Sequence, residues 1–508
     1  MSTAKTYSAH ICGLHMETVT VEVDISNGLH SFSVIGLGDR SVDEAKDRIS
    51  AAIKNTGYIS PKQKNQKVVI SLAPADTRKE GSSFDLAMAL AYLSASSDIE
   101  FDYENTLFLG ELSLEGKLRK IHGLLPILID APTHGFTAVF IPKENEKEAS
   151  LAQHIIIYPV SSLQEIVEHL MRHKKLIPLQ PRHTELHAEI DGVHRYDISH
   201  IRGNESSKRA LEIAVAGCHN IILYGPPGTG KTMLAQSMAS IMPPLSYEQA
   251  VEVTSIYSVA RILDQGLITH PPFRSPHHTS SAISILGGGT TPHPGEITLA
   301  HRGVLFLDEF PEFEQRVIEG LRQPLEERTI TVARARGSVT FPAQCIMVAS
   351  MNPCRCGKGK GNGCACSPRS IERYQRKLSA PVLDRIDIWI QVSKIDYEKL
   401  SLTQASSEKT KDIRKRVIQA RAVQMKRFHS QNKYYNSEMN AGDIEKYALL
   451  EDDARKLLTQ SAEKLGVSGR AFHRIIKVAR TIADLDCSPN IKKSHILEAI
   501  QYRQKKFG

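Results

Sequence analysis

The sequence predicts an α/β protein with a phosphate-binding core, a mixed α+β amino-terminal domain and a carboxy-terminal helical domain. Residues Gly225–Thr232 match the pattern G-x-x-x-x-G-K-[ST] of a phosphate-binding loop. Residues Thr18–Ile25 alternate between apolar and polar side chains, as in a half-buried strand. Residues Arg470–Ala483 place their apolar side chains on one face of a helix. Together these patterns favour an α/β class with a helical lid.

Composition sets limits on the class of protein. A chain of 508 residues should form about three domains, and we place them at 1–172, 196–400 and 401–508, with a polar linker at 173–195. The net charge of +8 permits a nucleic-acid partner without requiring one. We find no apolar run of about 20 residues and no signal peptide. Eight cysteines are too few for a disulfide scaffold, so we expect a cytoplasmic protein.

The phosphate-loop motif has the context that it requires. Asn220–Tyr224 reads as a buried strand, and Thr232–Ile241 reads as a helix whose amino-terminal dipole favours phosphate. Lys231 is expected to reach the β- and γ-phosphates, and the Thr232 hydroxyl to ligate Mg²⁺. A plain glycine-rich turn is the weaker alternative. The residues expected to bind the ATP cofactor are Gly225, Pro226, Pro227, Gly228, Thr229, Gly230, Lys231 and Thr232, together with Asp308.

A second apolar strand ends in two acids. Gly303–Phe310 contains Asp308, expected to hold Mg²⁺, and Glu309, expected to polarise the attacking water as general base. A surface acidic pair after a core strand is the alternative. Because the phosphate loop precedes it in the chain, we interpret the pair as the hydrolytic part of a nucleoside triphosphatase.

The amino-terminal region alternates strands and helices. We expect strands at 18–25, 31–35, 67–72, 106–112 and 138–141, and helices at 42–55, 84–93 and 123–131. This region, with Glu80–Leu86, Gly110–Gly116 and Gly135–Pro142, resembles the Lon-protease-like (S5-like) domain shared by Lon proteases and the ComM/YifB family. Ser83 matches the Lon nucleophile, but the position of the Lon lysine is Leu125 here. A serine without its base is a poor nucleophile, so we expect a non-proteolytic domain in which Ser83 caps or starts the following helix.

The remaining catalytic assignments come from the resemblance to magnesium-chelatase-like AAA+ ATPases. Cys345–Asn352 is a buried strand whose final Asn352 resembles the sensor 1 residue that positions water; a strand-capping asparagine is the alternative. Ser379–Asp387 resembles the stretch that carries the arginine finger, here Arg385, which acts on a neighbouring subunit and therefore implies a hexamer. Ser468–Ala471 resembles the sensor 2 region, with Arg470 as candidate; a solvated basic helix face is nearly as good an account.

Basic residues gather in an expected hairpin. Thr329–Phe341 reads as two strands around a tip with Arg334 and Arg336, and it resembles the pore hairpin of related helicases, whose arginines would contact DNA phosphates. An ordinary exposed hairpin is the alternative. Phe273–Ser280 resembles the helix-2 insert of the same clade. Near the carboxyl end, Ser494 is expected to cap a final helix.

Four cysteines lie close together in the sequence. Their thiolates would satisfy a tetrahedral Zn²⁺ site, although the C-x-C spacing is tighter than usual and an iron–sulfur cluster is the alternative. Lys358 and Lys360 lie between them and are candidate DNA contacts; a solvated charged loop would look similar. The four cysteines are Cys354, Cys356, Cys364 and Cys366.

The resemblance to the ComM/YifB family covers nearly the whole chain. It implies a hexameric ATP-driven motor that binds single- and double-stranded DNA, a helicase promoting branch migration when incoming DNA is integrated during natural transformation. Partners would include branched DNA junctions and recombination proteins. The residues alone also permit a magnesium-chelatase-type ATPase subunit, or an ATP-dependent assembly platform without helicase activity.

Overall fold

A computed structural model gives the structure of the chain. It describes residues 2–36, 40–75, 79, 81–181, 196–264, 266–289, 292–334, 337–359, 363–394, 408–429, 431 and 433–503. The chain divides into two compact units, one of residues 1–186 with 250–268, the other of residues 187–249 with 269–508. The expected domain bounds remain a prediction. Within the described residues, no helix is both long and apolar enough to cross a membrane.

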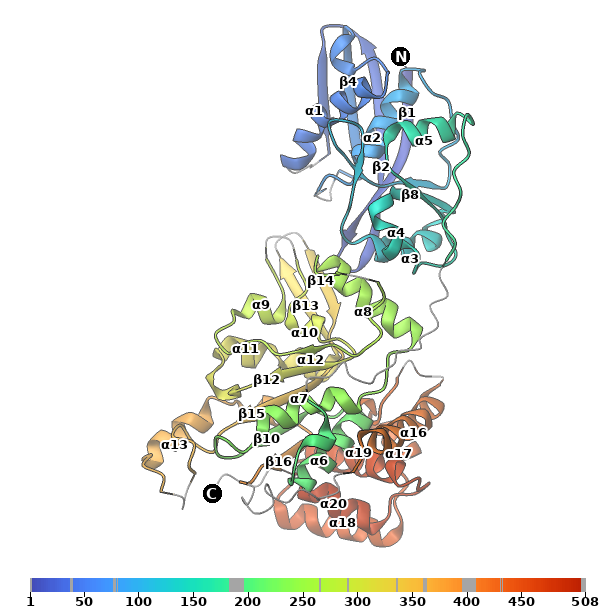
Figure 1. Ribbon diagram of the computed structural model, residues 1–508. Helices are drawn as coiled ribbons and strands as arrows, with labels where there is room; N and C mark the ends of the chain where they lie inside the picture. Colours follow the sequence, from blue (N-terminus) through green and yellow to red (C-terminus); the bar gives the residue numbers. More distant parts are fainter. Residues whose placement is uncertain are drawn as a thin grey trace. The chain divides into compact units, whose positions relative to one another are not determined.

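The first unit is built on a seven-stranded sheet in the order β3-β4-β2-β1-β5-β8-β9 (Figure 1). The pairs β1/β2 and β2/β4 are antiparallel, and β3/β4, β1/β5, β5/β8 and β8/β9 are parallel. Helix α2 lies on the buried side of β1 and β2, where ten of its eleven residues are buried. The strands are β1 (Ser2–Cys12), β2 (His15–Asn27), β3 (Ser31–Ile35), β4 (Gln66–Ala73), β5 (Thr106–Phe108), β8 (Ala138–Pro142) and β9 (Ile156–Val160).

The expected elements of this unit are present, with differences in the strands. The expected strand 106–112 is divided into β5 and β6, and three observed strands, β1, β7 and β9, were not expected. A small antiparallel ladder joins β6 (Glu111–Leu112) to β7 (Leu118–Arg119). The helices are α1 (Arg40–Asn55), α2 (Asp85–Ala95), α3 (Leu124–Asp130), α4 (Glu146–Ala149), α5 (Leu163–Leu170) and α8 (Tyr247–Val259).

Helix α8 follows the phosphate-loop helix in the chain, yet residues 250–268 belong to the first unit. Val251 and Leu267 pack against the apolar cluster that includes Leu124 and Leu125. The Ser258 hydroxyl donates to Glu148, whose carboxylate also accepts from the Leu125 N–H. Apolar packing and a buried carboxylate therefore hold this segment.

The second unit contains a five-stranded parallel sheet in the order β11-β12-β15-β10-β16. Its central strands are fully buried, as expected when helices cover both faces of a parallel sheet. Ligands of such sheets bind beyond the carboxyl ends of the strands. The strands are β10 (Ile221–Tyr224), β11 (Phe273–Arg274), β12 (Val304–Leu307), β15 (Ile346–Met351) and β16 (Ile388–Gln391).

The helices of the second unit cover this sheet and form the lid. The core helices are α6 (Glu205–Gly217), α7 (Lys231–Ile241), α9 (Ala282–Leu286), α10 (Glu296–Leu299), α11 (Gln315–Gly320), α12 (Arg322–Glu327), α13 (Pro368–Arg376) and α14 (Ala380–Leu383). The lid helices are α16 (Thr410–Phe428), α17 (Ala441–Tyr447), α18 (Asp452–Leu465), α19 (Gly469–Leu485) and α20 (Lys493–Gln501). An antiparallel hairpin joins β13 (Thr329–Arg334) to β14 (Gly337–Pro342), as expected.

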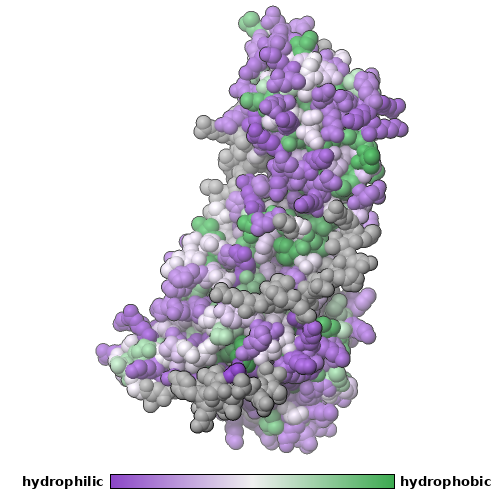
Figure 2. Space-filling model, in the orientation of Figure 1, coloured by the Kyte–Doolittle hydropathy of each residue, from purple (hydrophilic) through white to green (hydrophobic). Residues whose placement is uncertain are grey.

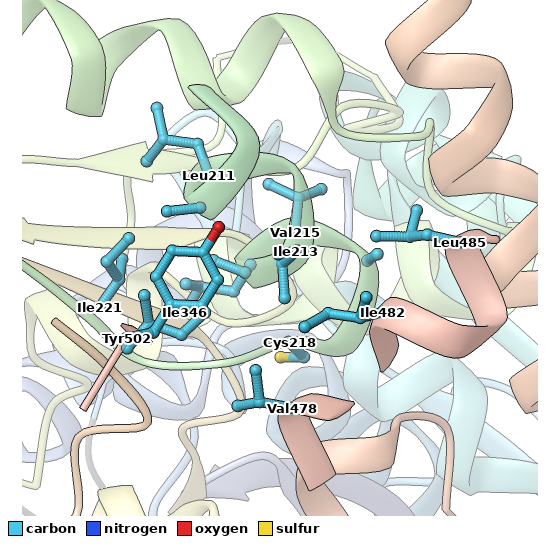
Figure 3. Packing of buried hydrophobic residues seen from close by; sticks show 14 of the residues in the cluster. Leu211, Ile213, Val215, Cys218, Ile221, Ile346, Val478, Ile482, Leu485 and Tyr502 are labelled. Carbon is cyan, nitrogen blue, oxygen red and sulfur yellow. The ribbon is translucent and has the colours of Figure 1, made fainter. Parts of the chain in front are cut away.

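One apolar cluster joins the sheet of the second unit to the lid. Figure 3 shows Ile213 and Val215 of α6 facing the same interior as Val478 and Ile482 of α19. These side chains are all at most 1% exposed, so burial of apolar surface fixes the lid on the core. On the face in Figure 2, hydrophilic residues cover most of the described surface and hydrophobic ones form small patches.

Two expected helix caps are wrong. Helix α2 begins at Asp85 with Phe84 at the cap position and no side-chain cap, so Ser83 lies one residue too early. Helix α20 begins at Lys493 with Lys492 at the cap position, which places Ser494 inside the first turn. Helix starts depend on tertiary packing as well as on the local capping residue.

Candidate functional site

The phosphate loop connects β10 to α7, as the motif requires. Gly230 precedes the helix with φ of 85°, a left-handed conformation that glycine adopts at little cost. A side chain at Gly225 would overlap the carbonyl oxygen of Val392, so the loop also needs glycine where it passes β16. The loop therefore folds as a cradle at the amino terminus of α7.

Lys231 is buried beneath this loop. Its ammonium donates to the carbonyl oxygens of Gly225 and Pro226 at 2.7 and 2.8 Å, and to Asn352 Oδ1 at 3.1 Å. Burial lowers the pKa of Lys231, and the nearby charges of Asp308 and Glu309 oppose that shift. The lysine thus lies between the loop and the end of β15, where the sequence predicts the β- and γ-phosphates to bind.

Thr232 and Asp308 come together. The Thr232 hydroxyl donates to Asp308 Oδ2 at 3.0 Å, although 76 residues separate them. Ser350 of β15 donates to the other oxygen, Asp308 Oδ1, and so fixes the carboxylate. A hydroxyl and a carboxylate are the hard oxygen ligands that Mg²⁺ prefers. This donor set fits the predicted magnesium site, and Ser350 is a part of it that the sequence analysis missed.

Glu309 has an unusual backbone conformation. Its φ is 52°, in the left-handed region that non-glycine residues occupy mainly at strained or functional positions. Its N–H donates to Asp308 Oδ1 at 3.0 Å, and its side chain is 55% exposed. His278 Nδ1 lies 3.4 Å from Glu309 Oε2. The segment around His278 resembles the helix-2 insert but predicted no role for this residue; the paired histidines after β11 were the available signal.

Asn352 directly follows β15 and lies beside the phosphate loop. The Gly225 N–H donates to the Met351 carbonyl at 3.2 Å, and Lys231 bonds the Asn352 side chain. The structure thus brings together Lys231, Thr232, Asp308, Glu309 and Asn352 at the carboxyl ends of three adjacent parallel strands.

Arg385 and Arg470 are placed elsewhere. Arg385 Nε lies 3.0 Å from Glu326 Oε2 of α12, and its Nη1 donates to the Pro381 carbonyl at 2.6 Å. The charges of Arg385, Arg470 and Arg474 all lower the pKa of Glu326, with the Arg385 hydrogen bond the largest cause. The arginine-finger and sensor 2 candidates therefore share one acidic neighbour, Glu326, which the sequence analysis missed.

A buried aspartate joins the lid to the sheet. Asp387 accepts from Arg474 Nη1 at 3.2 Å and from the Asn220 N–H at 3.2 Å, and it lies 3.3 Å from His219 Nδ1. Burial alone would raise the pKa of Asp387, but Arg474 and His219 hold it well below its usual range. This ionised carboxylate fixes α19 beside Asn220, the residue before the strand that leads into the phosphate loop.

The four cysteines form one cluster. Sγ of Cys354 lies 3.3 Å from Sγ of Cys356 and 3.5 Å from that of Cys364, and all four sulfurs lie within 4.8 Å of one another. A hydrogen bond from the Lys358 backbone and the neighbouring thiols lower the pKa of Cys356 to about 6. Four sulfur ligands around one point fit a tetrahedral Zn²⁺ site.

The candidate DNA contacts are only partly described. Arg334 ends β13 at the tip of the hairpin, whereas Arg336 and Lys360 lie outside the described residues. Lys358 is exposed between the cysteines. The hairpin and the position of Lys358 are therefore in place, and DNA contact stays a prediction.

Comparison with known sequences gives matches along the chain. The family profile of magnesium chelatase subunit ChlI matches residues 197–400, and the profile of the carboxy-terminal part of that subunit matches 407–503. A further profile, for subunit ChlI of Mg-chelatase, matches residues 21–145.

Similar proteins include the competence protein ComM of Haemophilus influenzae, which is 40% identical over 99% of this chain and 98% of the relative. The uncharacterized protein YifB of Escherichia coli is 39% identical over 99% of this chain and 97% of its own. The DNA replication licensing factor Mcm6 of Drosophila melanogaster is 22% identical over 60% of this chain and 36% of the relative.

Proposed function

Because the chain belongs to the ComM/YifB family of magnesium-chelatase-type AAA+ ATPases, we propose that it is a hexameric ATP-hydrolysing motor that acts on DNA. The observation that carries the proposal is the convergence of Lys231, Thr232, Asp308 and Glu309 beyond adjacent parallel strands. We infer that the motor is a helicase, which promotes branch migration while incoming DNA is integrated during natural transformation.

Each hydrolytic residue has a physical task. Lys231 moves its ammonium from the loop carbonyls to the β- and γ-phosphates, because phosphate oxygens compete well for a buried charge. Thr232 and Asp308 hold Mg²⁺, which neutralises charge on the transferred phosphoryl group. Glu309 accepts a proton from the attacking water. Asn352 orients that water from the end of β15.

A neighbouring subunit would complete the site. Arg385 is bonded to Glu326 and Pro381 rather than to the phosphate loop of its own chain. An arginine finger stabilises the charge that develops on the γ-phosphate in the transition state. Closed rings arise when such head-to-tail contacts repeat around an axis. We therefore propose that Arg385 acts across a ring interface and that Arg470 contributes from the lid.

DNA is the proposed substrate of the motor. One relative is named a competence protein and another a replication licensing factor, which supports a role in DNA processing. The hairpin with Arg334 and the exposed Lys358 offer positive charge for phosphate contacts. The four cysteines are proposed to hold Zn²⁺, in keeping with their sulfur geometry.

The test is ATP-dependent displacement of labelled strands from forked and four-way DNA junctions. We expect the wild-type protein to resolve such junctions only with hydrolysable ATP. The matched control is Glu309→Gln, which should bind ATP and DNA but leave the junctions intact, because it lacks the base. Active ATP hydrolysis without any strand displacement would instead favour a magnesium-chelatase-type subunit or an assembly platform.

A further inference from the structure

The cysteine cluster begins at the nucleotide site. Only Pro353 separates Asn352, which bonds Lys231, from Cys354. We use the name cysteine loop for the described residues Pro353–Gly359 and Gly363–Cys366. A movement of Cys354 would therefore be transmitted through Pro353 to Asn352, which contacts Lys231 of the phosphate loop.

The cysteine loop also touches the phosphate loop itself. Gly357 is buried with φ of 78°, and a Cβ atom placed there would lie 2.7 Å from Cδ and 3.0 Å from Cγ of Pro227. Distances this short mean that only glycine lets the two loops approach this closely. Pro227 is one of the residues between Gly225 and Gly228 that cradle phosphate. The backbone at Gly357 therefore supports one wall of the nucleotide site.

The cluster holds this contact in place. Cys356 precedes Gly357 directly, and the Gly357 N–H donates to the Cys354 carbonyl at 2.9 Å. The Gly359 N–H donates to Cys354 Sγ at 3.4 Å. Two sulfurs of the cluster thus flank the turn that presents Gly357. Four thiolates at this spacing would repel one another unless a cation bound them, so a bound ion would help to set the shape of the turn.

Helix α13, which follows the cysteine cluster in the chain, also contacts Asn352. A hydrogen bond joins the backbone of Asn352 to the buried hydroxyl of Tyr374, on helix α13. Asn352 therefore lies between the end of β15 and the first cysteine in the chain, and Tyr374 hydrogen-bonds its backbone.

We propose that the cysteine loop is a positioning element of the nucleotide site, and that its bound metal sets the affinity of the phosphate loop for ATP. The proposal rests on ATP and zinc binding as proposed above. Metal occupancy would act on the phosphate loop through two contacts, one between Gly357 and Pro227 and the other between Asn352 and Lys231. Loss of the metal would release both contacts and weaken nucleotide binding.

The test compares two glycines of the same loop. Gly357→Ala and Gly363→Ala both place alanine at positive φ, 78° and 71°, but no described atom lies within 4 Å of the Gly363 position. We expect Gly357→Ala to weaken binding of a fluorescent ATP analogue roughly tenfold, as overpacking does. Gly363→Ala should stay within about twofold. Zinc content, measured by elemental analysis, should be unchanged in both.

Two further arms separate the possible failures. Pro227→Ala removes the ring that Gly357→Ala meets, so the double variant should regain affinity relative to Gly357→Ala, measured as a double-mutant cycle. Removing zinc from the wild-type protein with a chelator should weaken ATP binding to a similar degree, and added Zn²⁺ should restore it. Equal affinities of the two glycine variants, or of zinc-loaded and zinc-free protein, would overturn the inference. Wild-type protein without zinc, or without ATP binding, would instead refute the proposed site.

Discussion

The contact between Arg385 and Glu326 gives a quantitative test of the arginine-finger assignment. Glu326→Gln removes the negative charge that holds the guanidinium but keeps an oxygen that can still accept its hydrogen bonds. Arg385→Ala removes the guanidinium itself. If Arg385 acts on the phosphate of a neighbouring subunit, the pair with Glu326 must open before hydrolysis, so the two variants should change the rate in opposite directions.

The structure sets the size of each effect. The Glu326 side chain is 53% exposed and that of Arg385 is 12% exposed. Ion pairs with such exposure contribute about 0.2–1 kcal/mol, so Glu326→Gln should raise ATP turnover by no more than about fivefold. Loss of a finger, in contrast, costs roughly 10³- to 10⁵-fold in rate. This gap exceeds ordinary experimental error.

The assay is steady-state ATP turnover at saturating ATP, with the oligomeric state checked by light scattering. Glu327→Gln is the matched control, because Glu327 is the next residue of α12 and bonds Gln323 rather than Arg385. It should leave turnover unchanged. Arg385→Ala subunits should also poison rings mixed with wild-type subunits. A loss in Glu326→Gln as deep as that in Arg385→Ala would mean that the arginine works through Glu326 within its own chain.

Two further predictions concern the lid. For Asp387, whose pKa is lowered in the folded state, the ionised carboxylate stabilises the fold above its unfolded pKa of about 3.9, and that contribution is lost as pH falls below this value; urea unfolding should show a larger acid-dependent loss in the wild type than in Asp387→Asn, where other carboxylates with a lowered pKa still contribute. Asp484 is 3% exposed and accepts hydrogen bonds from both Arg427 Nη atoms at 2.6 and 2.7 Å. Asp484→Ala leaves this largely buried guanidinium without its carboxylate, so it should lower the free energy of unfolding by about 3–5 kcal/mol. An unchanged midpoint of urea unfolding would contradict this prediction.

The sequence predicted the elements that carry a strong local pattern. Strand β3 has the expected bounds, and the phosphate loop lies between the expected strand and helix. Strand β1 escaped detection because its buried face carries Thr6 and Ser8, which are 0% exposed. The Thr6 hydroxyl donates to the Ala87 carbonyl at 3.0 Å, so burial of this polar group is compensated by α2, far along the chain. A strand of this kind has no apolar alternation to reveal it.

Side-chain contacts between residues far apart in the sequence could not be predicted from it either. Sequence motifs indicated Asp308 and Arg385, whereas their partners Ser350 and Glu326 belong to no motif. Ser350 is 42 residues from Asp308 in the sequence, and Glu326 is 59 residues from Arg385. Pairing across such distances follows from strand order and helix packing, which local residue patterns do not specify. The predictions that Ser83 and Ser494 cap helices were wrong for a related reason, because a residue can cap a helix only where packing lets that helix begin.

The arrangement of strand ends explains why the cysteine loop lies beside the phosphate loop. Strands β10 and β15 are neighbours in register, with Tyr224 opposite Met351, so the segments that leave their carboxyl ends begin side by side. One segment is the phosphate loop and the other is Asn352 with the first cysteines. The lid reaches the same sheet through Arg474 and Asp387, at the opposite, amino-terminal end of β10. If the cluster binds a metal as proposed, a change in it would act on the phosphate loop directly, whereas the lid contacts helix α7 through α16 and the amino-terminal end of β10 through Arg474.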